Sequence, residues 1–280
     1  MPMVGVSTGV ELYYETHGEG EAVVFIPSTA YSADVWLDSQ VPTLSESMQV
    51  VIFDPRGCGR STAAQGVYTI EQMACDTVAL LDALGIGAAH VVGHSMGGRI
   101  GLQMALDFPG RVKSLVMAAS GSGAAARSGD ECVPGLPFRL VRDLVEMGFE
   151  EYVRHEVMDT STFFTAEYRA QHADKVRAFY ELAWRTHSRF PEFVRLCMAR
   201  HMWEATHRLG SVRVPTLVLV GGEDVVGSDH IHQAKTLVER IPGAEYRMLP
   251  GQAHGFFWQA PDETNAVLRE WVLAHAGTPA

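Results

Sequence analysis

The serine of the pentapeptide Gly93–Gly97 is the residue of this chain best suited to nucleophilic chemistry. The five residues read Gly-His-Ser-Met-Gly and match G-x-S-x-G, in which a serine sits on a sharp turn between a strand and a helix. Residues 89–92 before the turn are expected to form a short buried strand, and residues 98–105 after it are expected to begin a helix. Glycines relieve crowding at such a turn, and the free amides at the helix start can stabilise negative charge. We therefore predict that Ser95 is a nucleophile.

A glycine-rich turn that opens a nucleotide-binding helix is the alternative interpretation of the same pentapeptide. Such a turn needs a glycine at its middle position, where the backbone approaches the pyrophosphate closely. Ser95 occupies that position here, which favours the nucleophile turn.

The order of acidic and histidine residues after Ser95 fits a hydrolytic triad. A serine nucleophile needs a histidine base and an acid that orients it, in the chain order Ser, Asp or Glu, His. Asp224 follows the apolar run 216–220, and His254 follows the run 246–249. Both lie just past the ends of predicted strands, where an open α/β sheet places its site. We predict the triad Ser95, His254 and Asp224, with the neighbouring Glu223 as an alternative acid.

The other histidines do not indicate a metal site. His94 occupies the variable position of the pentapeptide, where we expect it to pack behind the serine. His230 and His232 are two residues apart, so on a helix they would share neither a face nor a metal ion. The chain contains no H-E-x-x-H motif. The sequence therefore predicts no metal and no cofactor.

Strand and helix patterns alternate along most of the chain, which predicts a mostly parallel sheet with helices on both faces. Helical spacing over residues 69–84 ends at a glycine, and a terminal helix is expected at 264–275. The expected strands are residues 10–15, 22–26, 49–53, 89–92, 114–118, 215–220 and 246–249.

The segment 122–210 interrupts this alternation and predicts an inserted helical unit. We expect a core of residues 1–121 and 211–280, with the insertion setting substrate specificity. Twelve of the 25 aromatic residues lie between Arg127 and Gly210, under a third of the chain. Most of them would pack the helices together, and a subset would line an apolar pocket. The expected helices are residues 138–147, 150–156, 167–186 and 191–207.

Composition excludes several classes of partner. The 280 residues carry a net charge of −11, which argues against binding to nucleic acid or to an anionic membrane. No membrane-spanning run and no secretory signal are visible. The four cysteines show no CxxC spacing, so we expect free thiols in the cytoplasm, although a mature exported protein would look the same. The oligomeric state is not indicated.

The chain resembles the α/β-hydrolase superfamily over nearly its full length. The residues that carry the resemblance are Phe-Asp-Pro-Arg-Gly-Cys-Gly-Arg-Ser at 53–61, Gly-His-Ser-Met-Gly-Gly at 93–98, Gly-Glu-Asp at 222–224 and Ala-His-Gly at 253–255. The resemblance implies an α/β-hydrolase fold in which 122–210 is the cap. It also implies that the loop 54–61 lies near the site. That loop is similar to the one in proline iminopeptidases, a subfamily that the cap and the missing upstream motif do not support.

The loop after the strand 22–26 departs from the family pattern. The family usually has His-Gly there, and this chain has Pro27 and Ser28, followed by Thr29. The resemblance implies that two backbone amides bind the oxyanion, those of Thr29 and Met96. Thr29 keeps its amide, which only proline would lack. Enol-lactone hydrolases of the superfamily also replace this histidine with a small polar motif, so its loss does not imply loss of activity.

These residues predict a cofactor-free serine hydrolase that cleaves a carboxylic ester or lactone through an acyl-enzyme. The expected substrate is a small apolar or aromatic molecule. A carbon–carbon bond hydrolase acting on a ketone would use the same triad and stays an alternative. A ligand-binding protein with weak turnover is a third hypothesis, because of the altered loop at Pro27–Thr29. Haloalkane dehalogenases and epoxide hydrolases of this superfamily use an aspartate at the position of Ser95, which excludes them.

Overall fold

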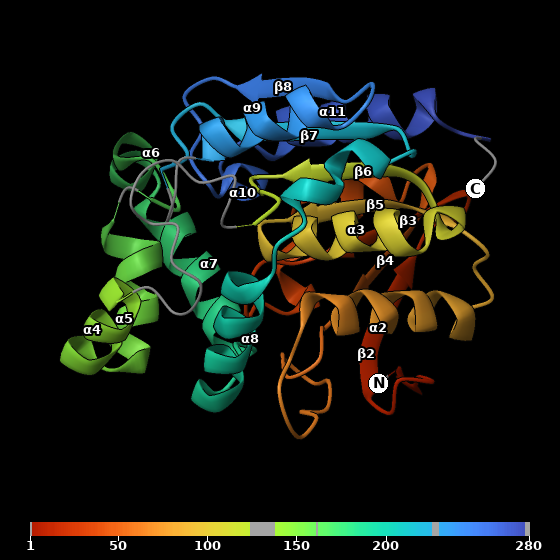
Figure 1. Cartoon of the computed structure of the whole chain (residues 1–280). Coiled ribbons are helices and arrows are strands. Elements are labelled where there is room, and N and C mark those ends of the chain that lie inside the picture. Colours follow the sequence, from red (N-terminus) through yellow and green to blue (C-terminus); the bar gives the residue numbers. More distant parts are fainter. Residues whose placement is uncertain (1, 124–137, 161, 226–229, 278–280) are drawn as a thin grey trace.

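The computed structural model describes residues 2–123, 138–160, 162–225 and 230–277, which contain an eight-stranded sheet (Figure 1). The strand order is β1-β2-β4-β3-β5-β6-β7-β8. The pairs β1–β2 and β2–β4 are antiparallel, and all pairs from β4 onward are parallel. The strands are β1 (Met3–Gly5), β2 (Glu11–His17), β3 (Glu21–Ile26), β4 (Met48–Phe53), β5 (Ala89–His94), β6 (Val112–Ala118), β7 (Thr216–Gly221) and β8 (Glu245–Leu249).

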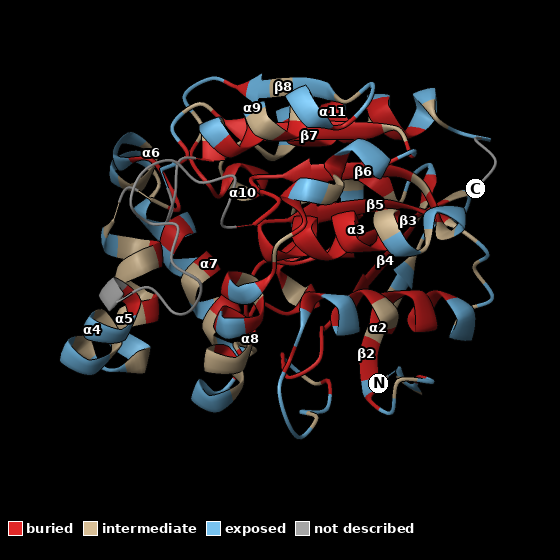
Figure 2. Cartoon of the chain, viewed as in Figure 1, coloured by how far each residue is buried: buried red, intermediate tan, exposed pale blue. Residues whose placement is uncertain are grey.

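Helices cover both faces of this sheet. Successive side chains of a strand point to opposite faces, so Val24 packs into one apolar cluster and Val23 into the other. The central strands are buried almost throughout (Figure 2). The predicted mostly parallel α/β sheet is thus confirmed. One cluster includes side chains of α2 (Ile70–Ala83), α3 (Met96–Asp107) and α9 (His230–Arg240), and the other those of α1 (Val41–Leu44), α10 (Phe256–Gln259) and α11 (Pro261–Ala274).

The inserted segment is helical, with different boundaries from those expected. The helix predicted over 167–186 is two helices, because the backbone of His172 leaves the helical region at φ −131° and ψ 40°. The helix predicted over 191–207 ends at Met202, where Trp203 turns extended. The helices are α4 (Phe138–Met147), α5 (Phe149–Arg154), α6 (Ala166–Gln171), α7 (Ala173–Arg185) and α8 (Phe190–Met202), with a π-helical turn at His155–Asp159.

Helices α4 to α8 lie together beside one end of the sheet (Figure 1). That residues 122–210 form a separate specificity unit stays a prediction, and residues 124–137 and 161 of it lie outside the described chain.

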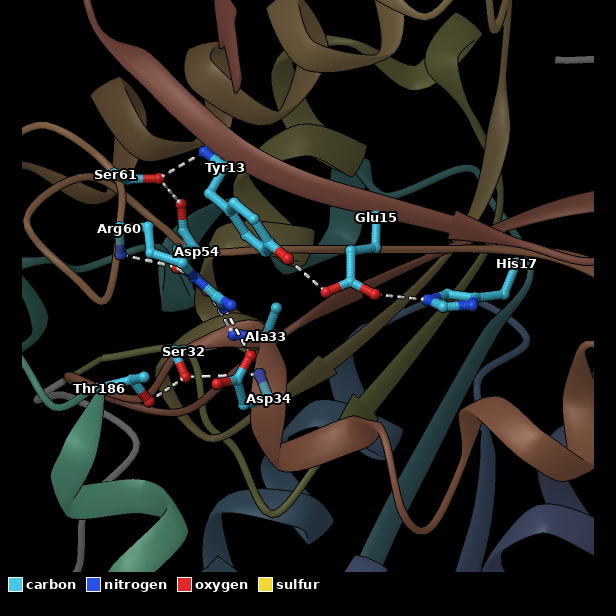
Figure 3. A network of polar contacts seen from close by, with 10 residues as sticks. All are labelled: Tyr13, Glu15, His17, Ser32, Ala33, Asp34, Asp54, Arg60, Ser61 and Thr186. Atoms are coloured by element: carbon cyan, nitrogen blue, oxygen red, sulfur yellow. Dashed lines mark hydrogen bonds and ion pairs between the residues drawn. The ribbon is translucent and has the colours of Figure 1, made fainter. Parts of the chain in front are cut away.

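Asp54 fixes the loop that follows β4 (Figure 3). Its fully buried carboxylate accepts hydrogen bonds from the Ala33 amide at 2.7 Å and from Arg60 Nε at 2.8 Å. The Arg60 guanidinium lies 3.5 Å from the centre of the Tyr13 ring. Because Ala33 belongs to the segment after β3, the hydrogen bond from its amide to Asp54 connects the loops that follow β3 and β4. The residues of the predicted loop 54–61 therefore hold the segment after β3 and the strand β2 in place.

The turn between α7 and α8 is attached to the same two loops. The hydroxyls of Thr186 and Ser32 are hydrogen-bonded to each other (Figure 3). The Thr186 carbonyl also accepts from the Gly59 amide at 3.0 Å. The Ser188 amide donates to the Ala30 carbonyl at 3.1 Å. These bonds place the start of α8 next to the loop that contains Thr29.

No helix in the described part of the chain combines the length and apolar character that crossing a bilayer needs. Three cysteines are free, Cys58, Cys75 and Cys197, and Cys132 lies outside the described residues. The cytoplasmic location stays a prediction.

Candidate active site

Ser95 sits on a strained turn between β5 and α3, as the pentapeptide predicts. Its backbone has φ 55° and ψ −112°, a conformation that residues other than glycine rarely adopt. The Ser95 amide donates to the Ala118 carbonyl at 2.8 Å, and its carbonyl accepts from the Ser120 hydroxyl at 2.7 Å. A Cβ atom on Gly97 would lie 2.1 Å from the Ile26 carbonyl oxygen, so only glycine allows this close approach. The turn is therefore held rigidly against β3 and β6.

Residues with strained backbone angles lie together at the carboxyl ends of the parallel strands, where Ser95 lies. Within the described chain, the residues other than glycine with positive φ are Ala30 (70°), Ser95 (55°) and Ala119 (49°). Each lies just past the carboxyl end of a strand, after β3, β5 and β6 respectively. Such conformations persist only where the surroundings impose them, and they cluster at functional sites. The carboxyl ends of these strands are therefore the candidate site.

The structure brings Asp224, rather than Glu223, to His254. The Asp224 Oδ2 atom lies 2.9 Å from His254 Nδ1, and both side chains are buried. Glu223 is exposed, and its backbone amide donates to the Gln252 carbonyl. An acid bound to Nδ1 leaves Nε2 of the same imidazole free to act as the base.

His230 contacts the other oxygen of the same carboxylate, an arrangement that the sequence analysis missed. Its Nδ1 lies 3.0 Å from Asp224 Oδ1, and its ring stacks on that of His254 at 4.9 Å. Burial works to raise the pKa of Asp224, but the charges and hydrogen bonds of His230 and His254 outweigh it and hold that pKa well below its usual range. His232 is exposed, so the expectation that His230 and His232 face different ways is confirmed.

Asp224, His230 and His254 are also the residues that could hold a metal ion. One ligand atom from each lies within 4.8 Å of the others. Both Nδ1 atoms already face the carboxylate at hydrogen-bonding distance, so an ion would have to replace those two bonds. An ion bound at His254 Nδ1 would remove the contact that orients this imidazole.

His94 packs behind the nucleophile as expected. It is fully buried, and its Nε2 lies 3.0 Å from the His254 carbonyl oxygen. Burial lowers the pKa of His94 well below its ordinary value, so the ring is neutral near pH 7 and can donate to that carbonyl. The pentapeptide therefore also positions the loop that carries His254.

Ser95 and His254 line the same cavity, with a volume of about 110 Å³. The loop after β3 contributes Ser28, Thr29 and Tyr31 to its wall. The inserted segment contributes the remaining residues: Leu140, Tyr152, Val153, Glu156, Val157, Thr162, Phe163, His187, Phe193, Cys197 and Arg200. The insertion thus supplies most of the residues that line the cavity.

The two residues predicted to donate to the oxyanion are the one that follows Ser95 and one in the loop after β3. Met96 is the first residue of α3, so its amide has no hydrogen-bond acceptor within that helix. Thr29 is buried and lines the cavity, and no partner of its amide is found among the described residues. Its hydroxyl accepts a hydrogen bond from Arg200 Nη1 at 3.1 Å, a contact the sequence analysis did not foresee.

Comparison with known proteins identifies the family. The sequence profile described as "alpha/beta hydrolase fold" matches residues 21–261. The chain is 30% identical to the "Putative carbamate hydrolase RutD" of Azorhizobium caulinodans, over 92% of this chain and 93% of that protein. It is 25% identical to the enol-lactonase from Burkholderia xenovorans LB400, whose crystal structure it matches with a TM-score of 0.83 over 97% of this chain and all of that one.

A third similar protein is Est816, described as an N-acyl homoserine lactone degrading enzyme. It is 28% identical, with a TM-score of 0.79 over 97% of this chain and all of the other. With the strand order and the nucleophile turn described above, these matches show that the chain belongs to the alpha/beta hydrolase fold family.

Proposed function

We propose that this protein is a serine hydrolase that cleaves a small carboxylic ester or lactone through an acyl-enzyme. The observation that carries the proposal is Ser95 on its strained turn, in one cavity with a histidine that is hydrogen-bonded to a buried aspartate. The similarity to an enol-lactonase and to a lactone-degrading enzyme supports an ester bond as the target.

In the proposed reaction, Ser95 Oγ attacks the carbonyl carbon while His254 Nε2 takes its proton. Asp224 holds His254 in the correct tautomer and stabilises the imidazolium. The amides of Thr29 and Met96 bind the tetrahedral oxyanion. His254 then returns the proton to the leaving alcohol, and a water activated by the same nitrogen releases the acid. In this proposal His230 is a positioning residue, because it contacts the carboxylate and not the substrate.

Aromatic residues of the insertion are proposed to select substrates with an apolar body. Tyr152, Phe163 and Phe193 line the cavity, and aromatic walls favour flat apolar groups over short alkyl ones. The proposed role of residues 122–210 is therefore to set specificity.

A substrate panel tests the proposed function. Benzyl acetate and methyl acetate have leaving alcohols of similar acidity, so their kcat/KM ratio reports binding and not intrinsic reactivity. We expect benzyl acetate to be favoured, by at least the ~10-fold that one buried apolar group can contribute. Higher kcat/KM for methyl acetate, with a decline as apolar bulk grows, would contradict the proposed specificity.

Three further compounds separate the alternatives. A γ-lactone and an aryl carbamate compare ester with carbamate cleavage, since one relative is named for a carbamate. A β-diketone reports carbon–carbon cleavage. Turnover of the diketone alone would favour the carbon–carbon hydrolase, and turnover of none would favour the binding protein.

Thr29 is expected to tolerate the loss of its hydroxyl, because its amide is the proposed oxyanion donor. Thr29→Ala and Thr29→Val should each retain kcat for benzyl acetate within about tenfold, against the loss of about 10²–10³ expected when a donor is removed. Steady-state kinetics and a melting curve for both variants make the measurement. A loss of the larger size in both variants with unchanged melting would assign the contact to the side chain instead.

A further inference from the structure

Arg200 brings a positive charge into the proposed substrate cavity. It lies in the last turn of α8, where Phe193, Cys197 and Arg200 are spaced four and three residues apart. Residues at this spacing share one face of a helix, and all three line the cavity. The cavity wall also contains aromatic and aliphatic side chains, hydroxyl and imidazole groups, and the carboxyl group of Glu156, so Arg200 is its one basic group of the Lys or Arg type among the described lining residues.

Helix α3 and the loop after β3 hold Arg200 in place. Its backbone carbonyl accepts a hydrogen bond from Arg99 Nη1 of α3 at 2.6 Å, and Arg99 is buried. Its Nη1 donates to the hydroxyl of Thr29 at 3.1 Å. The guanidinium is therefore fixed next to the loop that carries a proposed oxyanion donor.

The charge of Arg200 has no partner in the described chain. No carboxylate there lies within 4.0 Å of its guanidinium nitrogens, although Glu156 lines the same cavity. A guanidinium offers five N–H donors, and one bond to Thr29 leaves most of them available. A partly buried cation without an anion is unfavourable, which makes the site ready for a negatively charged group. The planar fork of N–H groups matches a carboxylate in particular.

We infer that the substrate carries a carboxylate, which Arg200 binds while the ester carbonyl faces Ser95. This inference rests on the proposed function, because it describes the substrate of that same site. Arg200 contacts Thr29, so the carboxylate would lie close to the reacting carbonyl. The class of substrate is then an ester whose acyl part carries a second, ionised carboxyl group, such as a half-ester of a short dicarboxylic acid.

Matched ester pairs test the inference. Monomethyl succinate, glutarate and adipate carry the carboxylate at increasing distance from the ester. Methyl esters that end in an isopropyl group in place of the carboxylate are neutral controls of the same shape. We expect the wild type to favour the charged member of at least one pair. Arg200→Met should lower kcat/KM for that member by about 10- to 100-fold, the loss expected for a hydrogen bond to a charged group. For the neutral member we expect a smaller loss, so that the ratio of kcat/KM between the charged and the neutral ester falls by about tenfold or more.

Arg195→Met is the control variant, since Arg195 lies on the same helix, pairs with Glu192 and does not line the cavity. It removes one positive charge from α8 and should preserve the preference for the charged ester. An equal fall for charged and neutral esters in Arg200→Met would overturn the inference, because it would place Arg200 in the stabilisation of the oxyanion or of the fold.

A binding measurement separates failure of the inference from failure of the proposed function. Calorimetric titration of glutarate into Ser95→Ala and into Ser95→Ala/Arg200→Met requires no turnover. Binding that weakens about tenfold or more in the double variant supports the inference even if no ester is hydrolysed. Equal binding, or no binding to either protein, overturns it. If the wild type hydrolyses neutral esters but Arg200→Met changes neither hydrolysis nor binding, the inference fails and the proposed function stands.

Discussion

Ser95→Ala is expected to abolish covalent labelling by a serine-directed fluorophosphonate and to lower kcat by about 10⁵-fold or more. The hydroxyl of Ser95 is the proposed attacking atom, and the remaining triad members cannot replace it. Loss of a serine nucleophile in a comparable triad costs about 10⁶-fold in kcat, because the triad acts as one unit. Intact-mass spectrometry should show one adduct on the wild type, mapped to the peptide that contains Ser95.

Ser120→Ala is the matched control for this labelling. Ser120 is a buried serine in the segment after β6, and its hydroxyl donates to the Ser95 carbonyl. The variant should still take up one adduct, since the nucleophile is unchanged. Undiminished labelling of a folded Ser95→Ala protein would refute the assignment of the nucleophile.

Asp224→Asn is expected to leave the protein folded and to lower kcat by about 10⁴-fold. An asparagine keeps the shape of the side chain but has no charge and only one oxygen, so it cannot accept from both imidazoles. With its N–H group toward His254 it holds that imidazole in the wrong tautomer. The buried carboxylate also carries the negative charge that stabilises the imidazolium formed during attack. Single-turnover kinetics with the best ester of the panel measure the loss, and a melting curve reports the fold.

Glu223→Gln provides the comparison for Asp224→Asn. Glu223 is the adjacent carboxylate, exposed on the same loop. Its neutralisation should change kcat by less than about threefold, as is usual for a surface substitution. A mild Asp224→Asn together with a severely impaired Glu223→Gln would show that the acid has been assigned to the wrong residue.

The position of the proposed nucleophile and the order of the triad could be predicted from the sequence because their signals are local. The turn at Ser95 depends on glycines within two residues of it, and the strands show as short apolar runs. The fold class follows from the alternation of such runs with helical patterns. Helix ends within the insertion were predicted less well. The break at His172 follows from backbone angles that a continuous helical pattern does not reveal.

Contacts between distant segments were decided only by the tertiary structure. The choice of Asp224 over Glu223 depends on the path of a loop, which buries one carboxylate beside His254 and leaves its neighbour in solvent. His230 reaches the same carboxylate because α9 begins beside that loop, and no spacing rule relates an acid to a histidine six residues later.

The same holds for the proposed substrate site. Thr29 and Arg200 are 171 residues apart in the chain, and they meet because the turn at Thr186 attaches the insertion to the loops after β3 and β4. Sequence by itself determined the sheet and the order of the chemical groups, since short-range patterns encode them. The cavity wall, and the charge within it, depend on how the helices of the insertion pack against the sheet, and this packing is a property of the whole folded chain.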